Sequence, residues 1–383
     1  MEKTSTPMLE QIHSLPAMVR DILPSFQEAA EEVLTPALCA SLQSIYLVGC
    51  GDSHMAALGG ELAFHTLAGM PTRAMMALHF SRYTVPFLAE PQTTAVIGIS
   101  VSGEVARTIE SVRLANKVGA VTMGITGAPH SRLAHSAHHV LKTSLPPPPT
   151  PVPTPGVRSY IASLLMLYLA AIRIGEVRGF LSSVAVQTAY RELEAVPDAI
   201  EATVQANEGA IQNLVTSWKD AQEFVFVGGG PNYGTALFSA AKLLEASGDS
   251  ALGQDTEEWT HLQYFARAVD TPTFFIDAGG RSNSRACEAA VAAKAIGRRV
   301  AAVVPVGEAV ISAQAEAVLP VHGKVREAFS PLLYGLAGML FAEYRTQLLG
   351  EKYFRAFGGG RSIEGGGGIS RIQTSELQEE VLP

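Results

Sequence analysis

Short apolar runs alternate with amphipathic stretches along this chain. In the first half the runs cover residues 45–48, 95–99 and 120–125, and in the second half they cover 224–227, 273–276 and 300–304. They are rich in β-branched side chains and end at glycine, serine or proline, which is typical of buried parallel strands. Amphipathic patterns over 104–118 and 284–296 predict helices between them. The alternation predicts an α/β fold with parallel sheets.

The two halves repeat one plan. The motif Val48-Gly49-Cys50-Gly51 recurs as Val227-Gly228-Gly229-Gly230, and the same offset carries Ile97 to Ile276 and Val121 to Val300. Two unrelated halves of one common architecture could match by chance, but three strands in register favour a duplication. We therefore expect two tandem domains, each built from alternating parallel strands and helices.

Several segments lie outside this repeat. Residues 8–34 predict a helix broken near Pro16 and Pro24, and residues 176–207 predict connecting helices interrupted at Pro197. The proline-rich stretch 146–155 is interpreted as a stiff loop over the first sheet rather than a domain linker. The predicted division is an N-terminal helical segment (1–34), a first domain (35–175), connecting helices (176–207), a second domain (208–350) and a glycine-rich tail over or near the active site (351–383).

Composition excludes several classes of function. Hydrophobic residues make up 47% and charged residues 17% of the chain, which is far from the composition of a disordered protein. The net charge of −8 without a long basic run makes a nucleic-acid or anionic-membrane partner unexpected. Three scattered cysteines without CxxC spacing suit a reducing cytoplasm, and no secretory signal is visible. The apolar stretch 159–174 is interpreted as a buried core helix.

Two loops after predicted strands have the composition of an anion site. One is Gly49-Cys50-Gly51-Asp52-Ser53, and the other is Ser100-Val101-Ser102-Gly103-Glu104, which precedes a helix. Small residues let the backbone approach an anion, serine hydroxyls donate hydrogen bonds, and a helix N-terminus adds partial positive charge. A tight turn and a helix cap are the alternative interpretations.

The second half offers different chemistry. The matching segment, Asp277-Ala278-Gly279-Gly280-Arg281, lacks paired serines, so only the first copy is expected to bind an anion. Lys242 and Glu245 lie three residues apart on a largely apolar helix and therefore share one face. They predict either a surface ion pair or a partly desolvated carboxylate suited to general-base work.

Together these residues resemble the double sugar isomerase (SIS) domain family, which includes the isomerase half of glucosamine-6-phosphate synthase and fructosamine-6-phosphate deglycase-like proteins. Cys50-Gly51-Asp52-Ser53 is similar to the Cys-Gly-Thr-Ser loop of the family. Residues 100–105 are similar to its Ser-x-Ser-Gly-Glu-Thr loop, and Lys242 to Glu245 to its Lys-x-x-Glu helix. The resemblance implies two tandem flavodoxin-like domains, each a five-stranded parallel sheet flanked by helices. It also implies a homodimer whose sites lie near the interface.

The resemblance also implies roles for particular residues. Glu245 would be the general base, with Lys242 beside it, and His261 would assist ring opening. The sugar phosphate would be held by the two loops, for which the candidates are Cys50, Gly51, Asp52, Ser53, Ser100, Val101, Ser102 and Gly103. Val105 stands where the family has a phosphate-binding threonine, so Arg107 and Thr108 become candidates for that contact.

Two departures from the family pattern shape the expected function. Asp52 replaces the threonine of the first loop, and the glycine-rich tail has no counterpart of the family's C-terminal lysine. No glutaminase segment precedes the first copy, so ammonia transfer from glutamine is not expected. We expect an isomerase, deaminase or deglycase acting on an amino-sugar, sugar or fructosamine 6-phosphate through an enediol or enolamine. No cofactor and no metal ion are expected. The alternatives are a non-catalytic phosphosugar-binding regulatory module and an isomerase of another anionic sugar such as a sulfosugar.

Overall fold

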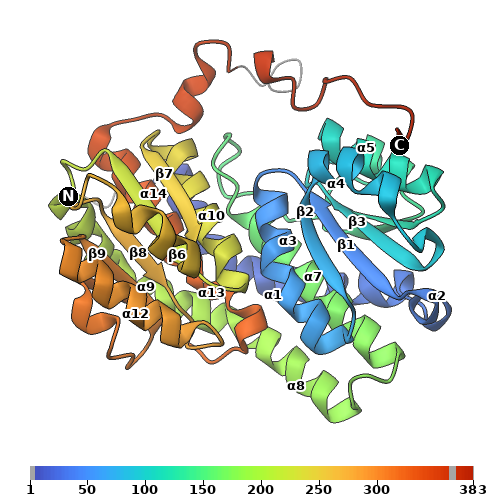
Figure 1. The fold of residues 1–383 in the computed structure, drawn as a ribbon, viewed down its shortest axis with the longest axis horizontal. Helices are drawn as coiled ribbons and strands as arrows, with labels where there is room; N and C mark the ends of the chain where they lie inside the picture. The colour runs from blue at the N-terminus through green and yellow to red at the C-terminus, as the bar shows by residue number, and fades with distance from the viewer. Residues whose placement is uncertain (1–4, 362–367, 383) are drawn as a thin grey trace. The chain divides into compact units, whose positions relative to one another are not determined.

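Two five-stranded parallel sheets of the same topology form the framework. The computed structural model describes residues 5–361 and 368–382. The chain divides into two compact units. The first-sheet unit comprises Met18–Pro146, Ser159–Arg191 and Phe357–Pro383, and the second-sheet unit comprises Met1–Ala17, Pro147–Arg158 and Glu192–Ala356 (Figure 1).

The first sheet has the strand order β2-β1-β3-β4-β5, and the second has the equivalent order β7-β6-β8-β9-β10. This order is that of flavodoxin-like folds, in which the chain reverses direction across the sheet between its first and third strands. The predicted duplication and fold class are confirmed. The strands are β1 (Ser44–Gly49), β2 (Thr72–Met76), β3 (Thr94–Ile99), β4 (Val121–Thr126), β5 (His139–Lys142), β6 (Glu223–Gly228), β7 (Ser250–Asp255), β8 (Thr273–Ile276), β9 (Val300–Pro305) and β10 (Ala317–Val321).

The strand register corrects two predicted equivalences between the two copies. Val300 pairs through Thr273 with Val225, and Thr122 pairs in the same way through Val96 with Tyr46, so Val300 is the counterpart of Thr122 and not of Val121. In the first sheet Val48 of β1 pairs with Gly98 of β3, whereas in the second sheet Val227 of β6 pairs with Phe275 of β8. Phe275 therefore matches Gly98, so Ile276 is the counterpart of Ile99 and not of Ile97. The offset shifts because the segments that connect the strands differ in length between the copies. As a consequence Asp277 is the counterpart of Ser100.

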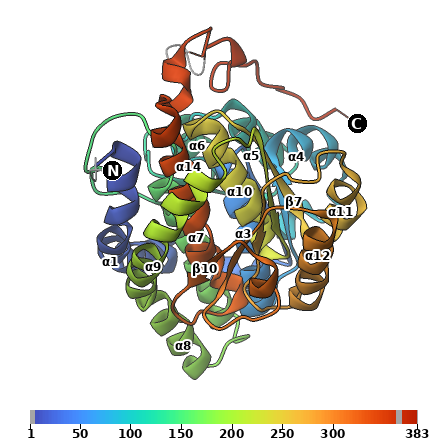
Figure 2. The same cartoon turned by 90° about the vertical axis from the view of Figure 1, so that its left-hand side faces the viewer.

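Helices cover both faces of each sheet. In the second-sheet unit α9, α10 and α14 lie on one face, and α11 and α12 lie on the other (Figure 2). In the first-sheet unit α7 packs on α3, where the Tyr168 hydroxyl donates to the Gly59 carbonyl at 3.2 Å. The helices are α1 (Pro7–Val33), α2 (Pro36–Ser41), α3 (Asp52–Ala63), α4 (Ala77–Tyr83), α5 (Ala106–Lys117), α6 (Arg132–Ser136), α7 (Arg158–Val177), α8 (Ser183–Glu194), α9 (Val196–Ser217), α10 (Pro231–Ala246), α11 (Thr256–His261), α12 (Asn283–Ile296), α13 (Pro331–Tyr334) and α14 (Leu336–Leu349).

Alternation along β6 shows how a doubly covered sheet builds its core. Val225 and Val227 pack with the alanines of α12, whereas Phe226 stacks on Phe274 at 4.6 Å between ring centroids and Phe224 contacts Phe341 of α14. Successive side chains point to opposite faces, and both faces are dry. The strand therefore reads as a continuous apolar run.

The predicted breaks in the first helix are wrong. Helix α1 continues from Pro7 to Val33 through Pro16 and Pro24. Each proline removes one backbone donor, a cost of about 3 kcal/mol in an isolated helix interior. A stripe of buried apolar side chains offsets this cost, because tertiary packing overrides local propensity: Ile12, Leu15, Met18, Val19, Ile22 and Phe26. The predicted interruption near Pro197 is confirmed, since α9 begins at Val196 with the proline in its first turn.

Most of the proline-rich segment belongs to the second-sheet unit. The chain leaves the first-sheet unit at Pro146, and Pro147–Arg158 belongs to the second-sheet unit, which corrects the interpretation as a loop over the first sheet. Prolines cannot donate backbone hydrogen bonds, so threonine side chains fix the segment. The Thr150 hydroxyl donates to the Glu10 carboxylate, and Gln11 donates to the Thr154 hydroxyl at 2.5 Å.

One helix of the described residues, α7, is long and apolar enough by length and composition to cross a bilayer. It is 20 residues long, and 83% of its most apolar window is buried inside the protein. It is the buried core helix that the apolar stretch predicts.

Candidate functional site

The first predicted anion loop lies at the carboxyl end of β1, in the first-sheet unit. Gly51 adopts φ 54° and caps α3, a conformation that favours glycine. A Cβ on Gly49 would lie 2.8 Å from the Ser53 backbone, so only glycine lets the strand end approach the first turn of the helix this closely. Asp52 is the first residue of α3, where the helix dipole stabilises a carboxylate. That placement gives the aspartate a structural role beside an anion loop.

The second predicted loop lies at the end of the neighbouring strand, β3. The Gly103 amide donates to the Ser100 carbonyl at 3.0 Å and closes a tight turn, with Gly103 at φ 66°. A Cβ on Gly103 would lie 1.9 Å from the Ser131 hydroxyl, so the position excludes any other residue. The Ser102 hydroxyl accepts from the Glu104 amide at 3.2 Å. The turn before α5 is therefore tightly specified.

Ser100 carries the clearest signal for a ligand. Its side chain is 1% exposed, and its hydroxyl is a buried group for which the structure contains no hydrogen-bond partner. A buried polar group without a partner costs roughly 1–3 kcal/mol. Such a group at the end of a parallel strand, next to a helix N-terminus, is suited to hold an oxyanion.

Neighbouring residues complete the lining of the first loop. Thr108 is buried on α5 and its hydroxyl lies 4.0 Å from the Cys50 sulfur. Burial raises the pKa of the Cys50 thiol, so it is a neutral lining group rather than a nucleophile. His54, on the first turn of α3, was not identified from the sequence. Burial lowers the pKa of its imidazole, which favours a neutral ring beside the loop. The sequence signal that could have identified His54 is its position directly after Ser53.

Arg107 makes contacts other than the predicted one. Its guanidinium bonds the Glu110 carboxylate and also donates to the Ser375 hydroxyl at 2.9 Å. Glu110 itself is fully buried and accepts from Ser81 at 2.8 Å and from Arg82 at 3.0 Å. Glu110 therefore joins Arg107 and Arg82 in one ion-pair network, and sequence reasoning had no signal for it.

We expect Glu110→Gln to lower the free energy of unfolding by about 3 kcal/mol at pH 7, because breaking a buried ion pair leaves cations uncompensated. Burial alone would raise the pKa of Glu110, but hydrogen bonds from Arg82, the Gln378 amide and Ser81, with the charge of Arg107, outweigh it and lower the pKa. The stabilisation is thus present above the unfolded pKa, near 4.3, and is lost as pH falls through the lower folded pKa. Urea unfolding of both proteins at pH 7 and below pH 4 measures this.

The matched control is Glu176→Gln, which removes a surface ion pair to Arg173 in the same unit. Exposed pairs contribute roughly 0–1 kcal/mol, so the control should unfold nearly as the parent does. An equal loss in both variants, or a loss for Glu110→Gln that does not shrink in acid, would contradict the assigned network.

Lys242 and Glu245 lie in the second-sheet unit. Helix α10 begins after Gly230, which has φ 56°, and its apolar face packs against β7 and α14. The Lys242 side chain is fully buried, and its Nζ lies 2.5 Å from Glu245 Oε2 and 5.0 Å from the Phe238 ring centroid. The Glu245 side chain is 32% exposed. A neighbouring ammonium favours the ionised carboxylate, which is the form that a general base requires.

His261 ends α11 and is exposed at the surface of the same unit. Its Nε2 lies 2.8 Å from Glu257 Oε1 on its own helix, and Arg285 also bonds Glu257. The anion loops thus belong to the first-sheet unit, and the three residues predicted for catalysis belong to the second-sheet unit.

In the second copy a carboxylate of the chain itself occupies the matching loop. Asp277 is 2% exposed, and its Oδ2 accepts from the Gly279 amide at 2.9 Å and from Asn283 at 2.7 Å. Burial raises the pKa of Asp277, opposed by these two hydrogen bonds. A carboxylate at the counterpart of Ser100 makes this loop unsuited to a second anion. In the part of the chain that the structure describes, no group of histidine, cysteine and carboxylate side chains could hold a metal ion.

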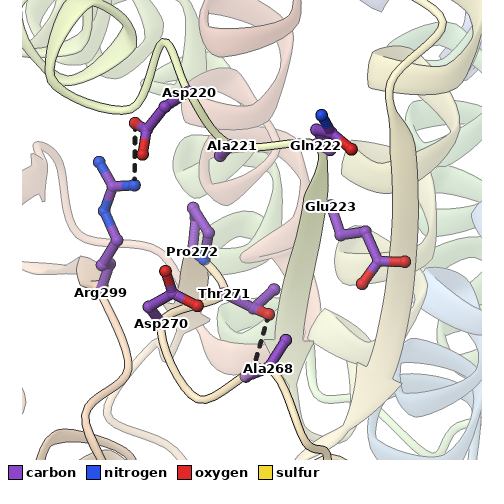
Figure 3. A pocket seen from close by; sticks show the side chains of 9 residues that line it. All are labelled: Asp220, Ala221, Gln222, Glu223, Ala268, Asp270, Thr271, Pro272 and Arg299. Atoms are coloured by element: carbon purple, nitrogen blue, oxygen red, sulfur yellow. Dashed lines mark hydrogen bonds and ion pairs between the residues drawn. The ribbon is translucent and has the colours of Figure 1, made fainter.

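A separate cavity of about 290 Å³ lies where strands of the second sheet begin, at their amino ends (Figure 3). Its lining includes Glu223, the first residue of β6, and Pro272, which precedes β8. Asp220 and Arg299 form an ion pair at 3.2 Å on its wall. In parallel α/β sheets ligands bind at the carboxyl ends of the strands, and this cavity lies at the amino ends.

Comparison with known proteins places the chain in a family. The SIS domain family matches residues 39–173. The glutamine–fructose-6-phosphate aminotransferase (isomerizing) of Gloeobacter violaceus is 31% identical over 330 residues, which are 85% of this chain and 53% of that protein. The C-terminal domain of the glucosamine-fructose-6-phosphate aminotransferase of Francisella tularensis superposes with a TM-score of 0.78 at 18% identity, covering 91% of this chain and 98% of that chain.

The chain is a double SIS-domain protein. A glucosamine-6-phosphate deaminase from Thermotoga maritima shares the double SIS fold, with a TM-score of 0.69 at 20% identity over 91% of this chain and 96% of that one. The chain spans about half the length of the curated relatives that it matches. The family and fold implied by the sequence motifs are thereby confirmed.

Proposed function

We propose that this double SIS protein is an enzyme that binds the 6-phosphate of a sugar, amino sugar or fructosamine and moves a proton between C1 and C2. The observation that carries the proposal is the buried Ser100 hydroxyl, which finds no hydrogen-bond partner among the described residues and lies in a loop suited to an oxyanion. The names of its relatives, a fructose-6-phosphate aminotransferase and a glucosamine-6-phosphate deaminase, support a hexose or hexosamine phosphate as the substrate class.

The proposed chemistry needs one base. The Glu245 carboxylate takes the proton from the carbon next to the carbonyl or imine. The C–H electrons form the C1–C2 double bond of an enediol or enolamine, and the carbonyl or imine π electrons move to its heteroatom, which takes a proton from water. The proton is then returned to the other carbon, while the hydroxyl on the first carbon gives its proton to water and becomes the new carbonyl, which completes an isomerisation. Where that first carbon carries an amine instead, the same step forms an imine, and water hydrolyses the imine to a carbonyl and releases the amine, as in a deaminase or deglycase. The ion pair with Lys242 keeps the carboxylate charged before this step.

The remaining parts of the proposal follow the family resemblance. Ser53, Ser100 and Ser102 bind the phosphate, with Thr108 and the Cys50-Gly51 turn lining the site, and His261 assists ring opening. A homodimer in the cytoplasm that uses no cofactor fits this assignment. The glycine-rich segment near residues 362–367 lies outside the described residues, so its placement over a site stays a prediction.

A substrate panel tests the proposal. The purified protein is incubated with the 6-phosphates of fructose, glucosamine and fructosamine, with the unphosphorylated sugars and with a sulfonated hexose. Proton NMR follows isomerisation, amine release and exchange with D2O of the C1 proton of a ketose or the C2 proton of an aldose. We expect exchange with at least one 6-phosphate and none with the unphosphorylated sugar. Binding without exchange or turnover would favour the regulatory module, and turnover of a sulfonate alone would replace the phosphate assignment.

A further inference from the structure

The C-terminal end of the chain folds back onto the unit that holds the anion loops. Residues 371–381, here called the strap, lie beside α5 (Figure 1). The Ile372 carbonyl accepts from the Ala106 amide at 3.0 Å, and the Gln378 amide donates to the Glu110 carboxylate at 2.7 Å. Ala106 is the first residue of α5, so the strap occupies an amide that helix geometry leaves without an intrahelical partner.

Apolar contacts and charge reinforce this docking. Leu377 packs on a core cluster of Ile109, Val112 and Leu133, and Val381 packs on the cluster around Val48. The strap also carries three glutamates, at 376, 379 and 380, and α5, on which it docks, carries Arg107, Arg113 and Lys117. Arg113 pairs with Glu379 at 3.9 Å. Opposite charges on the strap and the helices favour a docked strap at low ionic strength.

Arg132 joins the strap to the anion loop. Its Nε lies 2.6 Å from a carboxylate oxygen of Glu104, and its terminal nitrogen donates to the Glu104 carbonyl at 2.7 Å. The same nitrogen donates to the Gln373 carbonyl at 2.6 Å. Glu104 is the last residue of the Ser100–Glu104 turn, and its other carboxylate oxygen accepts from the Arg132 amide at 2.9 Å. One guanidinium therefore fixes the end of the loop and the strap together.

We propose that Arg132 is a positioning residue for the anion loop, and that the strap holds Arg132 in place. This inference rests on the proposed function, since it assigns a role in holding the substrate anion. A guanidinium bonded to three acceptors has its planar geometry fixed, which in turn fixes Glu104 and the turn that presents Ser100 and Ser102. Loss of the strap removes the Gln373 carbonyl as an acceptor and exposes the ion pair between Arg132 and Glu104 to water. The loop then samples other conformations and binds the anion less tightly.

The experiment compares the full chain with a chain ending at Ser370. The dissociation constants for inorganic phosphate and for a hexose 6-phosphate are measured by calorimetry, together with kcat and KM. We expect the truncated chain to bind both ligands about tenfold more weakly, with kcat at saturation reduced far less than KM is raised. A synthetic peptide of residues 371–383 added in trans should restore the affinity.

Point variants keep the test independent of truncation. Arg132→Ala should reproduce the rise in the dissociation constant, and Arg132→Lys should restore part of it. Arg113→Ala, which contacts the strap only through the pair to Glu379, is the control and should bind nearly as the parent does. Equal affinity in the full and truncated chains would overturn the inference, as would a truncated chain that the peptide fails to restore. If the full chain binds neither ligand, the proposed function itself falls.

Discussion

We expect Glu245→Gln to lower kcat by about 1,000-fold while the dissociation constant for the sugar phosphate changes by no more than several-fold. General acid–base catalysis by a positioned side chain contributes roughly 10²–10⁴-fold, and the amide keeps the shape of the carboxylate without its ability to accept a proton. The variant should also stop exchange of the substrate C2 proton with D2O, which reports the proton step even where product release limits turnover. Steady-state kinetics and NMR exchange measure the two quantities.

The ion pair complicates this variant, and two controls address it. Glu245→Gln removes the carboxylate that lies 2.5 Å from a fully buried Lys242, which can destabilise α10. Thermal unfolding therefore accompanies the kinetics, and the double variant Lys242→Met with Glu245→Gln removes both charges. Glu288→Gln changes an exposed glutamate of α12 in the same unit and should leave kcat unchanged. Normal exchange in a folded Glu245→Gln protein would remove Glu245 as the base.

Pattern reasoning recovered the strands well because their composition is set by burial on both faces. The run at 273–276 coincides with β8, and the other five predicted runs differ from their strands by one or two residues at the ends. The tandem α/β plan followed from these runs and the repeated glycine turn, whereas the five-stranded flavodoxin-like sheet followed from the family resemblance, because β2, β5, β7 and β10 gave no such run. The predicted equivalence of Ile276 with Ile97 is wrong because two residues of the same type can be aligned two positions out of register. The hydrogen bonds between the strands define a single register.

What could not be predicted depends on contacts between distant parts of the chain. Nothing local indicates that Arg107 bonds Glu110 and Ser375, or that Arg132 links Glu104 to Gln373. Sequence reasoning assigned Arg107 to the phosphate because of its position after the loop, where a free guanidinium would be well placed. The continuity of α1 through two prolines was missed for a related reason, since the packing that supports the helix lies outside the segment.

The two copies predict how the anion loop can be inactivated. We expect Ser100→Asp to lower affinity for a sugar phosphate at least 100-fold more than Ser100→Asn does. Asp277, the counterpart of Ser100, accepts hydrogen bonds from the Gly279 amide and the Asn283 side chain, so its carboxylate occupies its own loop. A carboxylate placed at 100 would do the same and would also repel the dianion. At about 4 Å and an effective dielectric constant near 20, each pair of unit charges costs roughly 4 kcal/mol.

Asparagine is the matched control because it has the size of aspartate without the charge. The affinity that Ser100→Asn loses relative to the parent measures the steric change and the missing hydroxyl. Loss of a hydrogen bond to a charged group lowers affinity roughly tenfold to a hundredfold. Titration with inorganic phosphate and with a hexose 6-phosphate, followed by calorimetry at one fixed salt concentration, measures all three proteins. Equal losses for the two variants would mean that no anion lies near Ser100. A retained affinity in both would place the phosphate elsewhere, because a buried side chain enlarged at its binding loop cannot leave the ligand undisturbed.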